Sequence, residues 1–299
     1  MRSSHLLLAS LAIQSSVARD VPTNIKNFYN SIKSAGSCSN KLQTGFYATD
    51  DGPNSRSFSY CGDHLSSSSV IYLQGTSGSL ADMDIDCDGV QNGPGNDGRC
   101  GSSSDTQSQT SFMDTVASYG QGVSDLNAFV HPYVVFGNVG SKAGYVNFDP
   151  RSVGVQPLSL MAVVCGDKMF YGIWGDENGD DGPKPMIGEA SISMATLCFG
   201  TSVNGNNGHT QTDVLYIAFT GNDAVPGTSA KWNAGSVNEF ESSIQALGDK
   251  LIQRIGGGTV STTPPTSTSP PAARCASCKT ADDCDGSLTC IGGKCGGCT

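Results

Sequence analysis

The chain has 299 residues, enough for one large domain and a small appendage, and its formal net charge is −10 at pH 7. An acidic surface repels nucleic acid and anionic membranes, and it concentrates cationic molecules in its clefts. Many proteins are acidic for solubility alone, so the charge favours a cationic substrate without establishing one. The sequence also lacks a Gly-x-Ser-x-Gly nucleophile motif, a phosphate-binding loop and a His-Glu-x-x-His zinc motif.

A targeting segment is predicted at the N-terminus. Arg2 precedes an apolar run over residues 6–13, and Ser16-Val17-Ala18 is typical of a cleavage site between small residues. The apolar run is too short to span a bilayer. We therefore expect a signal peptide over residues 1–18 and a secreted, extracellular protein. An N-terminal core helix is the alternative.

The main domain, residues 19–255, is predicted to be rich in β-strands. Residues 40–110 are turn-rich, with one strand at 70–73. Helices are expected at 24–35, with Thr23 as a cap, at 111–119, and at 237–255, where Ser236 and Glu239 form a capping box. Apolar strand-like runs occur at 129–136, 158–165, 168–174 and 213–219. These runs indicate an antiparallel or mixed sheet, which can close into a barrel.

Twelve cysteines behind a signal peptide indicate disulfides. Six of them lie in the main domain, and six cysteines allow many connectivities, among which the sequence does not choose. The pairs that we expect are Cys87–Cys100, Cys165–Cys198 and Cys38–Cys61. The first pair closes a short loop rich in Gly, Asn and Asp, and the second would tie two strand and helix segments of the main domain together.

The end of the chain differs in composition from the rest. Residues 256–273 are dominated by Gly, Thr, Ser and Pro, and we expect them to form an extended linker. Residues 274–299 hold the other six cysteines and are expected to form a small disulfide-rich module, with a zinc site as the alternative. Such a module could hold the main domain on a cell-wall polysaccharide. It lacks Trp and Tyr, so a wall tether or a stabilising cap stays open.

Two acidic residues carry the chemistry that we expect. Asp176 follows the strand-like run 171–175, and Glu189 opens a helix-like run after the Gly- and Pro-rich segment 177–188. Enzymatic hydrolysis of a glycosidic bond typically uses at least two carboxyl groups, because one protonates the leaving oxygen and the other activates the nucleophile. Most acid pairs are solvated surface side chains, so this pair alone identifies no activity.

Segments in order across about residues 22–255 resemble the fungal chitosanases of glycoside hydrolase family 75. The matching stretches are SYCGD at 59–63, MDIDCDG at 83–89, HPYVVFGN at 131–138, QPLS at 156–159, MAVVC at 161–165, YGIWGD at 171–176, GEASIS at 188–193, DAVPG at 223–227 and SAKW at 229–232. The resemblance implies an endo-hydrolase that cleaves β-1,4 bonds between glucosamine units of chitosan with inversion. The essential Asp and Glu of the family match Asp176 and Glu189.

The roles of the two carboxyl groups are argued from their surroundings. We assign Glu189 as general acid, because it lies between Ile187 and Ile192 in the more apolar setting. Asp176, in what we interpret as a polar loop, is assigned as general base for the attacking water. Glu177 and other acids of the intervening segment could raise the pKa of Asp176 and invert the roles. An inverting enzyme holds its carboxyl groups about 6.5–9.5 Å apart.

Five further residues are candidates for binding the substrate. Asp84, Asp86 and Asp88 could bind the ammonium groups of glucosamine; alternatively they cap backbone amides in a disulfide-linked turn, face solvent or hold a calcium ion. Trp174 and Trp232 could stack on sugar rings, although tryptophans more often belong to the core.

The predicted fold class is mainly β (β-rich α+β), with a barrel-like sheet and peripheral helices similar to the double-psi barrels of some endoglucanases, plus the small disulfide-rich C-terminal module. The expected protein is a secreted monomeric endo-chitosanase that uses no cofactor or metal and binds neither nucleic acid nor membrane. Two alternatives stay open: a non-catalytic cell-wall polysaccharide-binding protein, and a hydrolase of another polymer such as cellulose or chitin.

Overall fold

A computed structural model describes residues 19–48, 56–104, 106–180, 182 and 184–256, together with the backbone of two short strands near the C-terminus. The chain divides into two compact units, Met1–Gly257 and Gly258–Thr299. The expected signal peptide, the linker beyond residue 256 and most of the Cys-rich module lie outside the described residues. In the second unit, β11 (Cys290–Ile291) and β12 (Lys294–Cys295) form one antiparallel pair.

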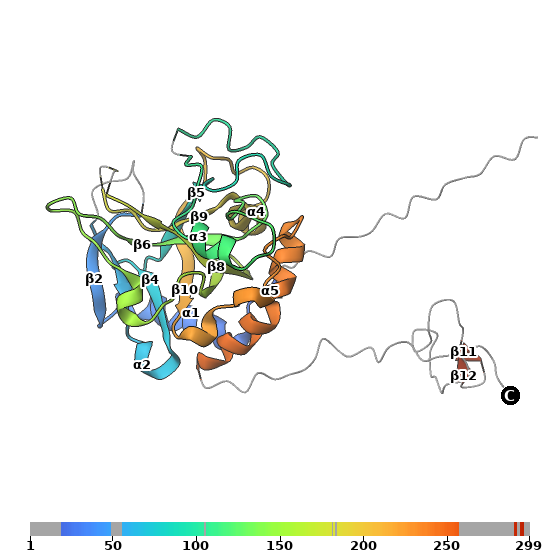
Figure 1. The fold of residues 1–299 in the computed structure, drawn as a ribbon. Helices are drawn as coiled ribbons and strands as arrows, with labels where there is room; N and C mark the ends of the chain where they lie inside the picture. Colours follow the sequence, from blue (N-terminus) through green and yellow to red (C-terminus); the bar gives the residue numbers. More distant parts are fainter. Residues whose placement is uncertain are drawn as a thin grey trace, which may run out of the picture. The chain divides into compact units, whose positions relative to one another are not determined.

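The first unit is built on a ten-stranded mixed sheet with a few helices (Figure 1). Its strands are β1 (Arg19–Asp20), β2 (Lys41–Phe46), β3 (Phe58–Cys61), β4 (Val70–Gln74), β5 (Ala81–Asp86), β6 (Tyr133–Asn138), β7 (Leu160–Cys165), β8 (Lys168–Asn178), β9 (Glu189–Ser191) and β10 (His209–Phe219). Its α-helices are α1 (Thr23–Ala35), α2 (Leu65–Ser68), α3 (Met113–Ser118), α4 (Ile192–Phe199) and α5 (Val237–Leu251). Short 3-10 turns are η1 (Pro150–Val153), η2 (Asn222–Ala224), η3 (Gly227–Ser229) and η4 (Ile252–Arg254). The prediction of a β-rich domain with a mixed sheet is confirmed.

The strand pairings form a closed circuit. β8 pairs with β6, β6 with β9, β9 with β5, β5 with β10, and β7 joins β10 to β8. The pairs β6–β8 and β5–β9 are parallel, and the others in this circuit are antiparallel. A side arm leaves β10 through β4 to β3 and β2. The segments that we expected to carry the candidate carboxyl groups, β8 and β9, both border β6.

The two long helices bury the apolar faces that the sequence predicts. Helix α1 buries Ile25, Phe28 and Ile32, but Pro22 and not Thr23 occupies its cap position. Helix α5 packs against β7 and β8, on one side of the sheet in Figure 1. Its Ser236 hydroxyl accepts the backbone N–H of Glu239, which is one of the two bonds of the predicted capping box; the Glu239 carboxylate accepts the N–H of Gly235 in place of that of Ser236. Within the described part of the chain, no helix is long and apolar enough to cross a membrane.

Two expected boundaries near the candidate site were wrong. The strand predicted at 129–136 begins only at Tyr133, because Asn127 organises a turn before it. The backbone N–H groups of Val130 and His131 both donate to the carbonyl oxygen of Asn127. The helix-like run expected at Glu189 is first a strand, β9, and helix α4 follows only after it.

Candidate active site

Strand β8 places Asp176 by means of a β-bulge. In the parallel pair β6–β8, Val134 is opposite Trp174 and Val135 is opposite Asp176, which leaves Gly175 as an extra residue on β8. Along a regular strand, residues two apart share a face, so Trp174 and Asp176 would point the same way. The bulge instead sends them to opposite faces of the sheet.

A glycine is required at this bulge because the chain is closely approached there. A Cβ atom at position 175 would lie 2.5 Å from Cβ of Tyr133 and 2.7 Å from Cδ1 of Leu126. The Trp174 ring on the other face is fully buried and packs edge-on against Phe112, with 4.9 Å between ring centroids. Its indole N–H donates to the backbone oxygen of Asp176 at 2.8 Å, so the core anchors the strand at the candidate carboxyl group.

Glu189 lies on the same face as Asp176, across strand β6. Val135 of β6 is the register partner of Asp176 on one side and of Glu189 on the other. Side chains in lateral register share a face, and neighbouring strands are about 4.8 Å apart. The α-carbons of Asp176 and Glu189 are therefore about 10 Å apart across two strand spacings. Ser191 ends β9, and its hydroxyl then accepts the N–H of Met194 to begin α4.

Both carboxyl groups line one groove of about 370 Å³. Its acidic lining residues are Asp86, Asp88, Asp176, Glu177, Asp180 and Glu189. Among the described residues that line it, none is Lys, Arg or His. A groove with this lining attracts cations and repels anions.

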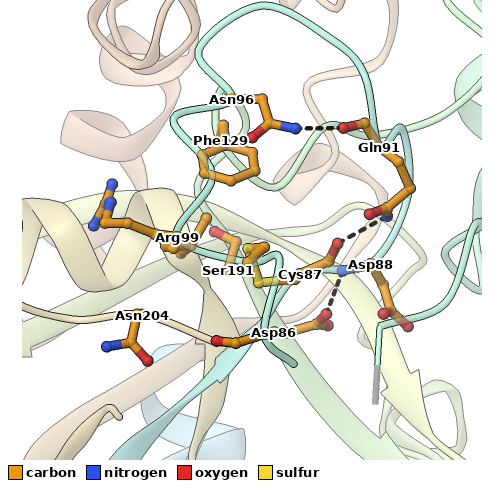
Figure 2. The surroundings of a disulfide bond; sticks show 12 residues. Asp86, Cys87, Asp88, Gln91, Asn96, Arg99, Phe129, Ser191 and Asn204 are labelled. Atoms are coloured by element: carbon orange, nitrogen blue, oxygen red, sulfur yellow. Dashed lines mark hydrogen bonds between the residues drawn. A yellow bond between two sulfur atoms is a disulfide. The ribbon is translucent and has the colours of Figure 1, made fainter. Parts of the chain in front are cut away.

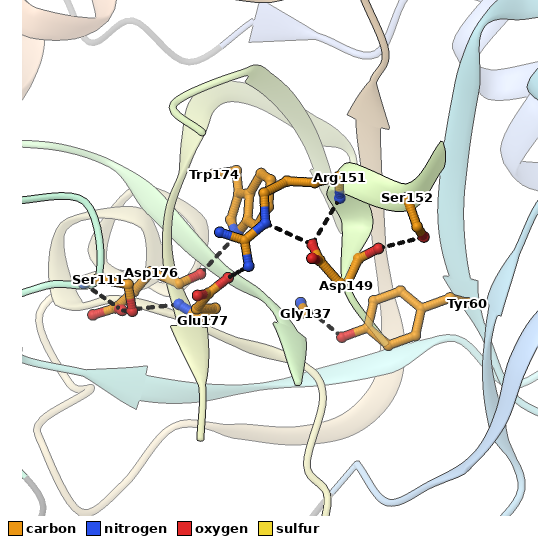
Figure 3. Close-up of polar contacts among 9 residues, drawn as sticks. All are labelled: Tyr60, Ser111, Gly137, Asp149, Arg151, Ser152, Trp174, Asp176 and Glu177. Carbon is orange, nitrogen blue, oxygen red and sulfur yellow. Dashed lines mark hydrogen bonds and ion pairs between the residues drawn. The ribbon is translucent and has the colours of Figure 1, made fainter. Parts of the chain in front are cut away.

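The carboxyl group of Asp176 is buried and held at one of its two oxygens (Figure 3). Oδ1 accepts the backbone N–H of Ser111 at 2.9 Å, the Ser111 hydroxyl at 2.5 Å and the backbone N–H of Glu177 at 2.8 Å. Burial raises the pKa of Asp176 to about 6, and the bonds from Ser111 and Glu177 oppose that rise. The expectation of a polar loop was wrong: Asp176 is in β8 and only 5% exposed, because β8 extends further than its apolar run.

Glu177, which we expected to disturb Asp176, has a cationic partner of its own. The guanidinium group of Arg151 lies 3.4 Å from its carboxylate, as Figure 3 shows. Asp149 holds the Arg151 Nε at 2.7 Å, and the guanidinium lies 6.0 Å from the ring centroid of Trp174. Burial raises the pKa of Glu177, and the positive charge of Arg151 opposes this. Asp180 accepts the backbone N–H groups of Ser141 and Lys142.

Asp86 and Asp88 flank Cys87 (Figure 2), and all three residues line the groove. Asp86 Oδ1 accepts the N–H of Asp88 at 2.6 Å, and Asp88 Oδ1 accepts the N–H of Gln107 at 2.6 Å. Both acids therefore cap backbone amides, as the alternative interpretation proposed, and also line the groove. Burial raises the pKa of Asp86 well above its usual range, and the charge of Glu189 adds to the rise.

Oxygens of Asp86, Asp88 and Asp176 lie within 4.8 Å of one another. Calcium takes roughly six to eight oxygen ligands, so this set of three does not by itself identify a calcium site. Six acids in one groove cannot all be ionised without a large cost in electrostatic free energy, and the most buried of them is expected to keep a proton.

Three of the candidate substrate-binding residues do not line the groove. Asp84 is half-buried beside Glu189 on β5, outside the groove lining. Trp174 and Trp232 have no exposed surface, and Trp232 stacks on Tyr119 with 5.1 Å between ring centroids. A ring without exposed surface cannot stack on a sugar, so the expectation of stacking was wrong for both tryptophans.

Within the described residues of the main domain, three disulfides cross-link the chain. They join Cys38 to Cys61, Cys87 to Cys100 and Cys165 to Cys198, the same pairs as those expected from the sequence. The second closes the loop after Asp86, and the third ties the end of β7 to helix α4 (Figure 2 shows the second).

Two residues near the proposed base were not expected from the sequence: Ser111, which contacts Asp176, and Arg151, which contacts Glu177. Ser111 precedes helix α3, and nothing in the local pattern relates it to Asp176, which is 65 positions away. Arg151 belongs to η1, where Asp149 caps the turn and Pro150 follows, a pattern that predicts a turn. That pattern still does not reveal that the Arg151 side chain reaches Glu177.

Comparison with known proteins gives a consistent result. Residues 83–254 match the model of the family described as fungal chitosanase of glycosyl hydrolase group 75. An endo-chitosanase of Aspergillus oryzae (strain ATCC 42149 / RIB 40) is 48% identical over 236 residues, which is 79% of this chain and 91% of the relative. An endo-chitosanase of Aspergillus fumigatus is 45% identical over 253 residues, 84% of this chain and 98% of the relative. Endo-chitosanase B of the same Aspergillus oryzae strain is 43% identical over 254 residues, with the same two coverages.

Proposed function

Because this chain belongs to the fungal chitosanases of glycosyl hydrolase group 75, we propose that it hydrolyses the β-1,4 bonds between glucosamine units inside chitosan chains. The observation that carries the proposal is the lateral row Asp176–Val135–Glu189, which presents two carboxyl groups on one face of an acidic groove. Chemistry with two carboxyl groups and water needs no cofactor or metal.

Asp176 is the general base and Glu189 the general acid. Three donors on Oδ1 of Asp176 favour its ionised form, and none of these bonds reaches Oδ2. Oδ2 takes a proton from water as the water oxygen attacks the anomeric carbon. Glu189 gives its proton to the glycosidic oxygen as that C–O bond breaks. The earlier reason for this assignment, a more apolar setting for Glu189, is wrong, because Asp176 is the more buried of the two. The assignment now rests on the hydrogen bonds.

Hydrolysis proceeds with inversion in this proposal. An α-carbon separation of about 10 Å, with both side chains on one face, suits carboxyl groups about 6.5–9.5 Å apart with a water molecule between them. Two carboxyl groups about 5 Å apart would instead favour a covalent intermediate and retention.

The acidic lining supports a substrate that carries ammonium groups. Asp88 and Asp86 are the candidate ammonium partners, because both line the groove and each accepts a backbone N–H. Asp86 is buried among other acids, so it becomes a partner only when a nearby ammonium group restores its ionised form.

The remaining parts of the proposal concern the whole chain. We infer a secreted monomer with a signal peptide over residues 1–18, a catalytic domain over 19–255, a linker over 256–273 and a Cys-rich module over 274–299 that binds cell-wall polysaccharide. The closed circuit of strand pairings supports a barrel-like sheet in the catalytic domain, and that this sheet is of the double-psi type stays part of the proposal.

Matched variants test this function. Glu189→Gln and Asp176→Asn should each lower the release of reducing ends from chitosan by at least about a hundredfold, while chitosan binding stays. If either variant releases sugar as fast as the unaltered protein, its catalytic role is wrong; if the unaltered protein binds chitosan without cleaving it, the protein is a wall-binding protein. NMR of the fresh anomeric proton should show inversion. Activity that rises with N-acetylation would refute recognition of ammonium groups.

A further inference from the structure

Two consecutive residues link the base of the proposed reaction to a second buried acid. Thr110 donates its backbone N–H to Oδ2 of Asp125 at 2.8 Å and its hydroxyl to Oδ1 at 2.6 Å. Ser111, the next residue, donates its backbone N–H and its hydroxyl to Oδ1 of Asp176. Each of these two consecutive residues thus donates its backbone N–H and its hydroxyl to one carboxyl group. The two carboxyl groups, those of Asp125 and Asp176, come from distant parts of the chain.

Asp125 lies behind the groove. It is 3% exposed and is not among the residues that line the groove. The N–H of Leu126 gives its Oδ1 a further bond at 2.7 Å. Asp125 therefore has three donors and does not face the substrate. Burial raises the pKa of Asp125, and the hydrogen bonds from Thr110 and Leu126 oppose that rise, so the negative charge of Asp125 is present only above its raised pKa.

We propose that Ser111 and Asp125 are positioning residues for Asp176: Ser111 fixes Oδ1 so that Oδ2 faces the reacting water, and Asp125 places a second negative charge behind the base. The two act on the base in opposite directions. A donor to the carboxylate stabilises its ionised form, whereas a neighbouring negative charge opposes ionisation. The bonds from Ser111 lower the pKa of Asp176 and the charge of Asp125 raises it, after the larger effect of burial. This inference rests on the proposed role of Asp176 as base.

Other titratable groups also face Asp176 and stay unchanged in the test. They are Asp86 on β5, Asp88 after that strand, Tyr133 on β6, Glu177 on β8 and Glu189 on β9. Arg151 reaches this group only through Glu177.

The test compares variants with opposite expected shifts. Ser111→Ala removes one donor, so the pKa of Asp176 should rise by about half a unit to one unit; the exposure of Ser111 to solvent limits the effect. Asp125→Asn removes a charge, so the pKa of Asp176 should fall by up to about one unit. Ser111→Thr keeps the hydroxyl and should restore the original value. Ser118→Ala and Asp167→Asn, both exposed and outside the groove lining, are the matched controls.

Two measurements separate this inference from the proposed function. The first is an NMR titration of the Asp176 carboxyl carbon, with the signal assigned by comparison with Asp176→Asn. It measures the pKa of Asp176 without substrate. The acid limb of the pH profile of kcat/KM, measured on soluble chitosan oligomers, reports the pKa of the catalytic base. Opposite shifts in the titration support the inference. If the pKa of Asp176 shifts in the NMR titration but the acid limb of kcat/KM does not move, the link from Ser111 and Asp125 to Asp176 is supported and the role of Asp176 as base is refuted. Unchanged titration of Asp176 in folded variants, or shifts in the same direction, overturns the inference.

If Asp125→Asn does not fold, a second variant still tests the role of Asp125. Thr110→Val removes one donor from Asp125 and leaves that residue less ionised, so the pKa of Asp176 should again fall. A rise or no change in that variant would equally overturn the role of Asp125.

Discussion

Gly175→Ala tests whether the bulge in β8 aims the proposed base. The added Cβ would lie 2.5 Å from Cβ of Tyr133, which the backbone of β6 holds in place, so one of the two strands must move. Overpacking of this kind costs about 1–3 kcal/mol. For a domain of this size, that cost lowers Tm by roughly 2–12 °C. A shift of about 1 Å in Asp176 should lower kcat by about a hundredfold.

The assay is release of reducing ends from chitosan, with thermal melting of the same samples. Gly235→Ala is the matched control, because a Cβ there meets only Glu239 Oε2 at 3.7 Å, an ordinary contact. The control should keep the activity and the Tm of the unaltered protein. If Gly175→Ala keeps both as well, the bulge does not depend on glycine and the argument for how Asp176 is aimed is refuted.

Three further predictions follow from the surroundings of the groove. Arg151→Met should raise the pKa of Glu177, and a less ionised Glu177 repels the ionised form of Asp176 less, so the pKa of Asp176 and the acid limb of kcat/KM should move downward; Glu177→Gln should move the limb in the same direction, and an unmoved limb in both variants contradicts the coupling. Burial raises the pKa of Asp82 to about 9, so between about pH 4 and 9 the folded state binds more protons than the unfolded state and stability falls as pH rises. Asp82→Asn should therefore flatten the dependence of Tm on pH in that range, and an equally steep curve would show that Asp82 is not responsible. Replacing Cys87 and Cys100 by Ser should lower stability in urea by about 3 kcal/mol and lower kcat/KM, because their loop lines the groove; unchanged values for both would count against this.

The elements that sequence periodicity predicted well are those with long apolar patterns. Helices α1 and α5 and strands β4, β7 and β10 fall where their patterns indicated. Strand β5 was missed, because alternate acids such as Asp82 and Asp84 are typical of a turn when nothing shows that the sheet buries them wholly or in part. Strand β9 has only three residues, too few for any period to be detected.

Only part of the candidate site could be predicted, because the rest of it depends on strand pairing and tertiary packing. Asp176 and Glu189 were identified from motifs in the chain, but their shared partner Val135 depends on strand pairing, which one sequence does not reveal. An extra residue such as Gly175 leaves the local composition unchanged, so the bulge is invisible to periodicity. Whether Trp174 and Trp232 face a sugar or the core is decided by exposure, which follows from tertiary packing.

The double pairing of Val135 has a consequence for how such enzymes can vary. The spacing of the two acids across the sheet is set by main-chain hydrogen bonds to one central strand, and Met186 and Gly188, which lead into β9, are hydrogen-bonded to Asn138 and Asp84. The part of the connecting segment ahead of Met186 can therefore gain or lose residues during evolution, or in engineering of substrate preference, while the spacing of the two acids stays the same.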